Sequence, residues 1–104
     1  MRAEALKGHL DALILAVVSG GPLHGYAIIE ELKRRSAGSL DLAEGTVYPA
    51  LHRLESGGLL VSSWSQGEGR RRRVYQLTRR GERELQSRRG EWRDFVRVVE
   101  AVLA

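Results

Sequence analysis

Residues 45–55 carry the side chains best suited to chemistry. Val47, Leu51 and Leu54 follow the three- and four-residue spacing of a buried helix face. The opposite face then presents Thr46, Tyr48, Pro49, His52 and Arg53. A hydroxyl, a phenol, an imidazole and a guanidinium on one exposed face can bond phosphates and the edges of nucleic-acid bases. The alternative interpretation is an ordinary amphipathic surface helix.

A run of basic side chains follows. The segment from Gly69 to Gly81 contains no acidic residue and these arginines: Arg70, Arg71, Arg72, Arg73, Arg79 and Arg80. A positive field of this density suits a polyanion, although a solvated charged loop is the alternative. Strand alternation would send Arg71 and Arg73 to one face and Arg70 and Arg72 to the other, so the four cannot all touch one ligand. The net charge of +4 over the chain adds little to this indication.

Other kinds of site find no support in the sequence. The chain has no cysteine, which excludes disulfides and thiolate metal sites. His9, His24 and His52 lack metal-ligand spacing, and no segment resembles a nucleophile elbow or a phosphate loop. We therefore expect no enzyme activity, no cofactor and no metal. The longest apolar run, 12–18, is too short to span a bilayer, and the charged N-terminus does not resemble a signal peptide, so we expect a cytoplasmic protein without a membrane contact.

These groups must be positioned by the elements of one compact domain of 104 residues. Hydrophobic periodicity predicts a mainly α chain with a small β-hairpin. In order, the elements are helices over 4–19, 24–36 and 43–56, a hairpin over 59–78 and a long helix over 79–104. Three helices followed by a hairpin form the winged helix-turn-helix arrangement, in which the third helix enters the major groove and the hairpin is the wing. We expect residues 1–78 to bind DNA and 79–104 to form a dimerisation helix packed with 4–19.

Several local details can also be predicted. Pro49 lacks the N–H that would bond the Gly45 carbonyl, so the third helix should be bent or irregular in its first turns, with Asp41 or a neighbour as its cap. The hairpin strands should cover 59–65 and 72–78, separated by a glycine-rich turn. We expect Thr78 to cap the last helix, and Trp64 and Tyr75 to serve core or cross-strand packing.

The last helix carries a heptad pattern. Leu85, Trp92 and Val99 repeat every seven residues, and Phe95 and Val102 fill the complementary positions. The expected dimer-interface residues are Leu6, Leu10, Leu85, Trp92, Phe95, Val96, Val99, Val102 and Leu103. Dimer-core packing explains Trp92; alternatively, Trp92 with Val96 and Leu13 offers a stacking surface for a flat apolar effector.

Four motifs carry a family resemblance. Residues 22–26 resemble the "GPxHGY" signature of PadR-like proteins, and 45–55 resemble their recognition helix "GTLYPxLxRLE", with valine at 47 in place of leucine. Residues 69–81 are similar to the wing pattern "GRxRxxYxLTxxG". Trp92 lies at a position of the last helix where PadR-like proteins often carry tryptophan. Their order and spacing extend over nearly the whole chain, which resembles the short PadR type with a single C-terminal helix.

The resemblance implies a homodimer whose last helix packs against the first and last helices of its partner. Two recognition helices would then meet successive major grooves of a palindromic operator. The resemblance also implies a transcriptional regulator. Members of the family are mostly repressors, which a small hydrophobic or aromatic effector releases from DNA. The implied operator contacts are Thr46, Tyr48, Arg53 and His52, the implied phosphate contacts Tyr26 and Lys33, and the implied wing contacts Arg70, Arg71 and Arg72. The alternative is a winged-helix module that uses its basic face to bind an acidic protein.

Overall fold

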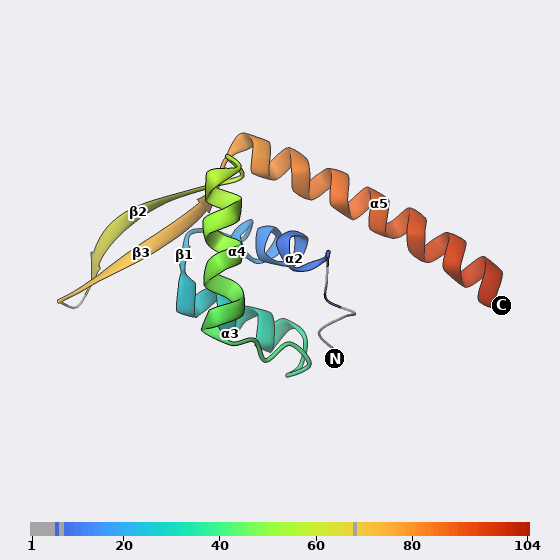
Figure 1. Cartoon of the computed structure of the whole chain (residues 1–104), viewed down its shortest axis with the longest axis horizontal. Helices are drawn as coiled ribbons and strands as arrows, with labels where there is room; N and C mark the ends of the chain where they lie inside the picture. Colours follow the sequence, from blue (N-terminus) through green and yellow to red (C-terminus); the bar gives the residue numbers. More distant parts are fainter. Residues whose placement is uncertain (1–5, 7, 68) are drawn as a thin grey trace.

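The computed structural model describes residues 6, 8–67 and 69–104. Its elements, in chain order, are α2 (Leu10–Val18), β1 (Leu23–His24), α3 (Gly25–Arg35), α4 (Glu44–Ser56), β2 (Leu60–Gly67), β3 (Arg70–Leu77) and α5 (Arg79–Leu103). The strands form an antiparallel sheet in the order β1-β3-β2. The β2–β3 hairpin projects to one side of the α2–α4 helices, and α5 extends to the other (Figure 1). The predicted winged helix-turn-helix class is therefore confirmed.

The first helix and the hairpin differ in detail from the sequence prediction. A turn at Gly8, whose φ is +84°, precedes α2, so the predicted helix over 4–19 is not continuous. Its residues 4, 5 and 7 lie outside the described part of the chain. The hairpin strands extend to Gly67 and from Arg70, which leaves a tighter turn than predicted. β1 was not predicted, because its two residues carry too little pattern; it pairs Leu23 with Tyr75.

The third helix is continuous. α4 runs from Glu44 to Ser56 with Pro49 inside it, so the irregularity predicted for its first turns does not break the helix. Pro49 is exposed, and the proline costs one backbone hydrogen bond without breaking the helix. The N-cap is Ala43 rather than Asp41, and the Ala43 carbonyl accepts from the N–H groups of Thr46 and Val47.

One apolar core joins α2, α3, α4, the sheet and the start of α5. Its most completely buried side chains are Ile14, Leu15, Ile28, Val47, Leu51 and Leu60. Leu6 and Leu85 belong to this same core, which corrects the prediction that they face a partner subunit. Leu85 therefore binds the beginning of α5 to the helix-turn-helix, across the predicted division at residue 78.

The junction between β3 and α5 is fixed by a cap. The Thr78 hydroxyl accepts from the Gly81 N–H at 3.0 Å and donates to the Gly58 carbonyl at 2.7 Å, which confirms the predicted N-cap. A Cβ on Gly81 would lie 2.1 Å from the Leu59 carbonyl oxygen, so only glycine permits this approach. The cap and the close contact together set the direction in which α5 leaves the core.

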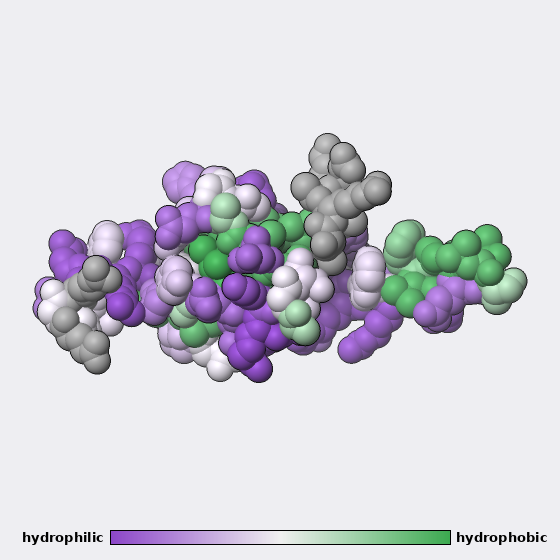
Figure 2. Space-filling view, turned by 90° about the horizontal axis from the view of Figure 1, so that it is seen from below, coloured by the Kyte–Doolittle hydropathy of each residue, from purple (hydrophilic) through white to green (hydrophobic). Residues whose placement is uncertain are grey.

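The second half of α5 carries an exposed apolar surface. Trp92, Phe95, Val98, Val102 and Leu103 are between 51% and 79% exposed. Figure 2 shows hydrophobic residues gathered at the far end of this helix. We call these five residues the α5 apolar face. Among the described residues, no helix combines the length and the apolar character needed to cross a membrane.

Candidate nucleic-acid interface

The exposed face of α4 has the composition that the sequence predicts. Its inward side chains, Val47, Ala50, Leu51 and Leu54, are buried in the core. The expected contact residues are all exposed: Thr46, Tyr48, Pro49, His52 and Arg53. Because the apolar side of α4 faces the core, these polar side chains lie on the side of the helix that is accessible to a ligand.

Tyr48 lies directly over the start of α3. A Cβ built on Gly25 would be 2.6 Å from Tyr48 Cε1 and 2.7 Å from its hydroxyl oxygen. The ring therefore occupies the space that any other residue at position 25 would fill. Burial, and next the charge of Glu44, raise the pKa of the Tyr48 phenol above its ordinary value, so the hydroxyl is neutral and can donate.

His24 connects α3 with the wing. Its Nδ1 accepts from the Ala27 N–H at 3.2 Å and caps α3, while Nε2 lies 3.0 Å from Arg72 Nη1. Burial, and next the charge of Arg72, lower the pKa of the imidazole below its ordinary value. A neutral imidazole has one acceptor nitrogen and a guanidinium only donates, so the ring satisfies these two donors one at a time.

The other wing face carries a tryptophan with two arginines. The Arg71 and Arg73 guanidinium carbons lie 4.7 and 5.2 Å from the centre of the Trp64 ring. Arg73 Nε also donates to Ser62 Oγ at 2.7 Å, and its Nη2 lies 3.7 Å from Glu55 Oε2 at the end of α4. Arg72 points to His24 on the opposite face, as the predicted alternation requires. Trp64 is opposite Arg73 in the strand pair but is 55% exposed, so it serves cross-strand contact rather than the core.

These elements enclose a basic, aromatic groove between α3, α4 and the hairpin. Its volume is about 480 Å³, and it is lined by His24, Gly25, Tyr26, Tyr48, Arg71, Arg72, Arg73 and Tyr75. It therefore gathers four of the predicted contacts, Tyr26, Tyr48, Arg71 and Arg72, which come from three separate segments. We call this the wing groove.

Two of the remaining predicted contacts are held by acidic residues. Arg53 Nη2 lies 2.6 Å from Asp11 Oδ1 on α2, and Lys33 Nζ lies 3.9 Å from Asp41 Oδ1. The Arg70 side chain is outside the part of the chain that the structure describes. Sequence reasoning did not single out Gly25 and Arg73 as part of this groove, although the "HGY" motif and the arginine run were signals for them.

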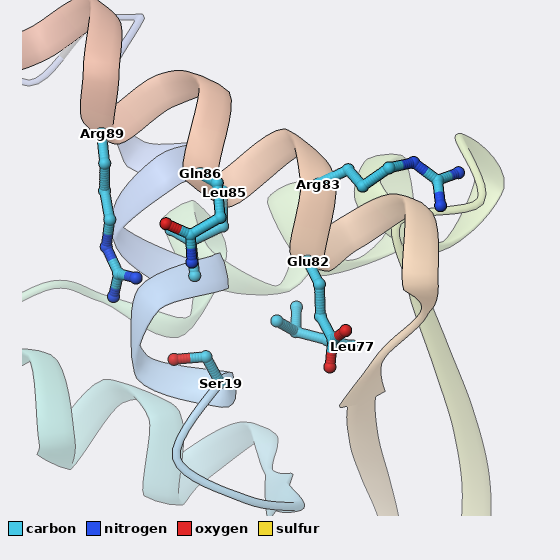
Figure 3. Close-up of a pocket in the computed structure, with 7 residues that line it drawn as sticks. All are labelled: Ser19, Leu77, Glu82, Arg83, Leu85, Gln86 and Arg89. Carbon is cyan, nitrogen blue, oxygen red and sulfur yellow. The ribbon is translucent and has the colours of Figure 1, made fainter.

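Two further hollows lie along α5, away from the wing groove. One, of about 290 Å³, lies between α2 and α5 and includes Leu13 and Trp92 but not Val96 among its lining. His9 meets the Trp92 ring edge-on there, with centroids 5.2 Å apart. The other, of about 460 Å³, lies between the end of α2 and the first turns of α5. Figure 3 shows Gln86 and Arg89 pointing from α5 towards Ser19 in this second hollow.

An exposed α4 and an arginine-rich hairpin, mounted on a three-helix core, define a winged helix-turn-helix protein. Residues 14–87 match the model of the transcriptional regulator PadR-like family, and the chain belongs to this family. It is 38% identical to transcriptional regulator Rv3488 of Mycobacterium tuberculosis over 83% of this chain and 78% of that protein.

Solved structures agree with this membership. A PadR family transcription regulator from Clostridium difficile R20291 is 35% identical, with a TM-score of 0.82 over 93% of this chain and 100% of that one. The structure of Bacillus subtilis PadR in complex with operator DNA is 27% identical, with a TM-score of 0.69 over 77% of this chain and 46% of that one. The chain is therefore a PadR family transcriptional regulator with a DNA-binding fold.

Proposed function

We propose that this regulator is a sequence-specific DNA-binding repressor that acts as a homodimer and leaves its operator when a small hydrophobic or aromatic effector binds. The observation that carries the DNA-binding part is the wing groove. It places three tyrosines and three arginines beside the exposed face of α4. The similarity to Bacillus subtilis PadR, which was solved with operator DNA, supports the same use of this surface.

The side chains divide by the part of DNA that they would contact. Thr46, Tyr48 and His52 on α4 reach base edges, with Pro49 packed against them, and Arg53 joins them once it leaves Asp11. Phosphates are contacted by Tyr26, Lys33, Arg70, Arg71 and Arg72. Phosphate contacts supply affinity and salt dependence, while the α4 contacts choose the sequence.

The α5 apolar face supports the proposed homodimer. Five large apolar side chains, each more than half exposed on one helix, are removed from water when a second copy of the chain covers them. One α4 per chain reads half a site, and a two-fold dimer reads a palindromic operator with half-sites one helical turn apart. The 79–104 segment thus serves dimerisation, while the 1–78 segment binds DNA.

A binding assay tests the DNA-binding part directly. We expect the protein to retard DNA from the region upstream of its own gene in a salt-sensitive and sequence-selective manner. Because Tyr48 is proposed to touch base edges, Tyr48→Ala should weaken specific binding by about 1–3 kcal/mol. Gln86→Ala, on α5 and outside the wing groove, is the matched control. Equal binding to unrelated DNA would contradict sequence-specific recognition, and recovery of an acidic protein partner without DNA would favour a protein-binding module.

The effector is proposed to enter the hollow between α2 and α5. Its lining is mostly apolar, and Trp92 offers a ring for an aromatic molecule to stack on. In a Trp64→Phe variant, Trp92 is the sole tryptophan, so its fluorescence reports this hollow. We expect aromatic ligands that release DNA to quench Trp92. Unchanged Trp92 fluorescence across a panel of such ligands would contradict this site.

A further inference from the structure

We propose that Trp64 is a DNA contact of the wing: its ring and the two arginines held over it lie against the sugar–phosphate backbone of a bound duplex. The proposal rests on the proposed DNA-binding function. It adds a contact by Trp64, a residue that the sequence assigned to core or cross-strand packing. Four observations support it, namely the exposure of the ring, its arginine neighbours, the strand face it occupies and the groove next to it.

The Trp64 face continues the inner face of the sheet outward. In the β2–β3 pair, Ser62 is opposite Tyr75, and Tyr75 is buried. One step further out on the same face, Trp64 is opposite Arg73, and the ring is 55% exposed. The hairpin thus carries a large aromatic ring past the end of the core, where the described residues of the chain leave more than half of it uncovered.

The two arginines give this ring a preference for an anionic partner. Both guanidinium groups lie within the distance at which a cation is attracted by an aromatic face. A guanidinium over a ring keeps N–H groups at its edge free to donate, and the indole N–H is a further donor. Because the ring already restricts both side chains, less conformational freedom is lost when they bind phosphates.

The wing groove brings this face within reach of DNA. Arg71 and Arg73 line the groove together with Tyr48 of α4. Arg73 is also fixed to the end of α4 through Ser62 and Glu55. A duplex that seats α4 in its major groove therefore passes beside Trp64, and wing arginines in such a place contact phosphates or the minor groove.

Fluorescence tests the contact itself. Trp92→Phe leaves Trp64 as the sole tryptophan. We expect a saturating mixed-sequence DNA duplex at low salt to shift the emission of Trp64 and to protect it from acrylamide. Subtracting the signal of the Trp64→Phe variant from that of the wild type gives the same quantity with Trp92 in place. Unchanged acrylamide quenching of Trp64 on saturation would overturn the proposal.

Affinity measurements test the consequence. Trp64→Ala should weaken binding of the same duplex about tenfold, while Trp64→Phe should keep most of the affinity. Since Trp64→Ala removes no charge, the slope of log affinity against log salt should stay near that of the wild type. Arg71→Ala should lower the magnitude of that slope by about 0.9. Val61→Ala, an exposed apolar residue on the opposite face of β2, is the matched control and should bind as the wild type does.

The outcomes separate this proposal from the proposed function. A wild-type protein that binds no DNA would overturn both. If the wild-type protein binds DNA and Trp64→Ala binds it as tightly at every salt concentration, the Trp64 contact alone is overturned. Circular dichroism should show that both proteins are folded in this comparison.

Discussion

At the scale of single residues, the contact between Tyr48 and Gly25 decides how α4 presents its central side chain. The ring rests on the backbone at the start of α3, and this support exists because Gly25 has no Cβ. Tyr48 is thereby held partly buried at the edge of the wing groove while its hydroxyl remains available. A recognition side chain that is fixed before binding loses less entropy when it meets DNA.

We predict that Gly25→Ala weakens both the fold and DNA binding. The new Cβ would lie 2.6 Å from Tyr48 Cε1, so the ring must move. Overpacking of this kind costs about 1–3 kcal/mol of the free energy of unfolding, which urea titration measures. In a Tyr48→Ala background the same substitution should cost less, because the clash has no partner. Equal costs in the two backgrounds would show that Tyr48 does not occupy this space.

His24 gives the chain a pH dependence of known sign. Burial and Arg72 lower the pKa of the folded His24 below its ordinary value of 6.5, so the unfolded state binds more protons between these two values. We predict that the His24 contribution is fully present above about pH 6.5 and is lost as the pH falls through the lower, folded pKa. Urea unfolding of the wild type and of His24→Asn, whose amide can cap α3 without titrating, measures the difference. A similar acid-side decline in His24→Asn would contradict this assignment; His52→Asn serves as the surface control.

At the scale of elements, the ion pair between α2 and α4 restrains a predicted DNA contact. Arg53 is bound by Asp11 at 2.6 Å, and Asp11 adds a negative charge beside the recognition face. DNA must therefore compete with Asp11 for Arg53. Such exposed pairs contribute little to stability, which makes this restraint inexpensive to remove.

We predict that Asp11→Asn raises DNA affinity several-fold and changes the free energy of unfolding by less than about 1 kcal/mol. The substitution frees Arg53 and removes a like charge from the phosphates' surroundings. Fluorescence anisotropy with labelled operator DNA measures the affinity. Asp94→Asn makes the same charge change on α5, where Asp94 pairs with Arg97 at 3.1 Å, and is the control. An equal gain in both variants would attribute the effect to net charge alone.

The elements themselves show which features periodicity can predict. Core spacing located α3, α4 and α5 because Val47, Leu51 and their equivalents must face inward in any arrangement. β1 could not be predicted because two residues have no periodicity and form a strand only by pairing with β3. The Arg53–Asp11 ion pair could not be predicted because the two residues are 42 positions apart and meet only after α2 and α4 pack. The alternation of Arg71 and Arg72, by contrast, followed from strand geometry alone.

At the scale of the whole molecule, two kinds of surface lie on opposite sides of the helical core. The wing groove gathers positive and aromatic groups on the side of the hairpin. The apolar face lies on the far half of α5, which extends to the other side (Figures 1 and 2). The heptad pattern predicted the exposed positions Trp92, Phe95 and Val102, but it could not show that Leu85 is used by the chain's own core. A periodic pattern gives the face of a helix, and only packing shows which partner each part of that face contacts.

The α5 apolar face leads to the prediction that dimerisation and operator binding fail together. Val102 is 78% exposed, so Val102→Glu places a charge on this face without disturbing the core of one chain. We expect a monomer by sedimentation, with circular dichroism unchanged, and a large loss of affinity for a full palindrome but little for a half-site, because avidity is lost while each α4 is intact. Ala101→Glu puts the same charge about 100° around the helix axis from Val102, away from Phe95 and Leu103, and should remain dimeric. A Val102→Glu protein that sediments as a dimer would move the subunit interface elsewhere, and a monomer with full palindrome affinity would show that one recognition helix suffices.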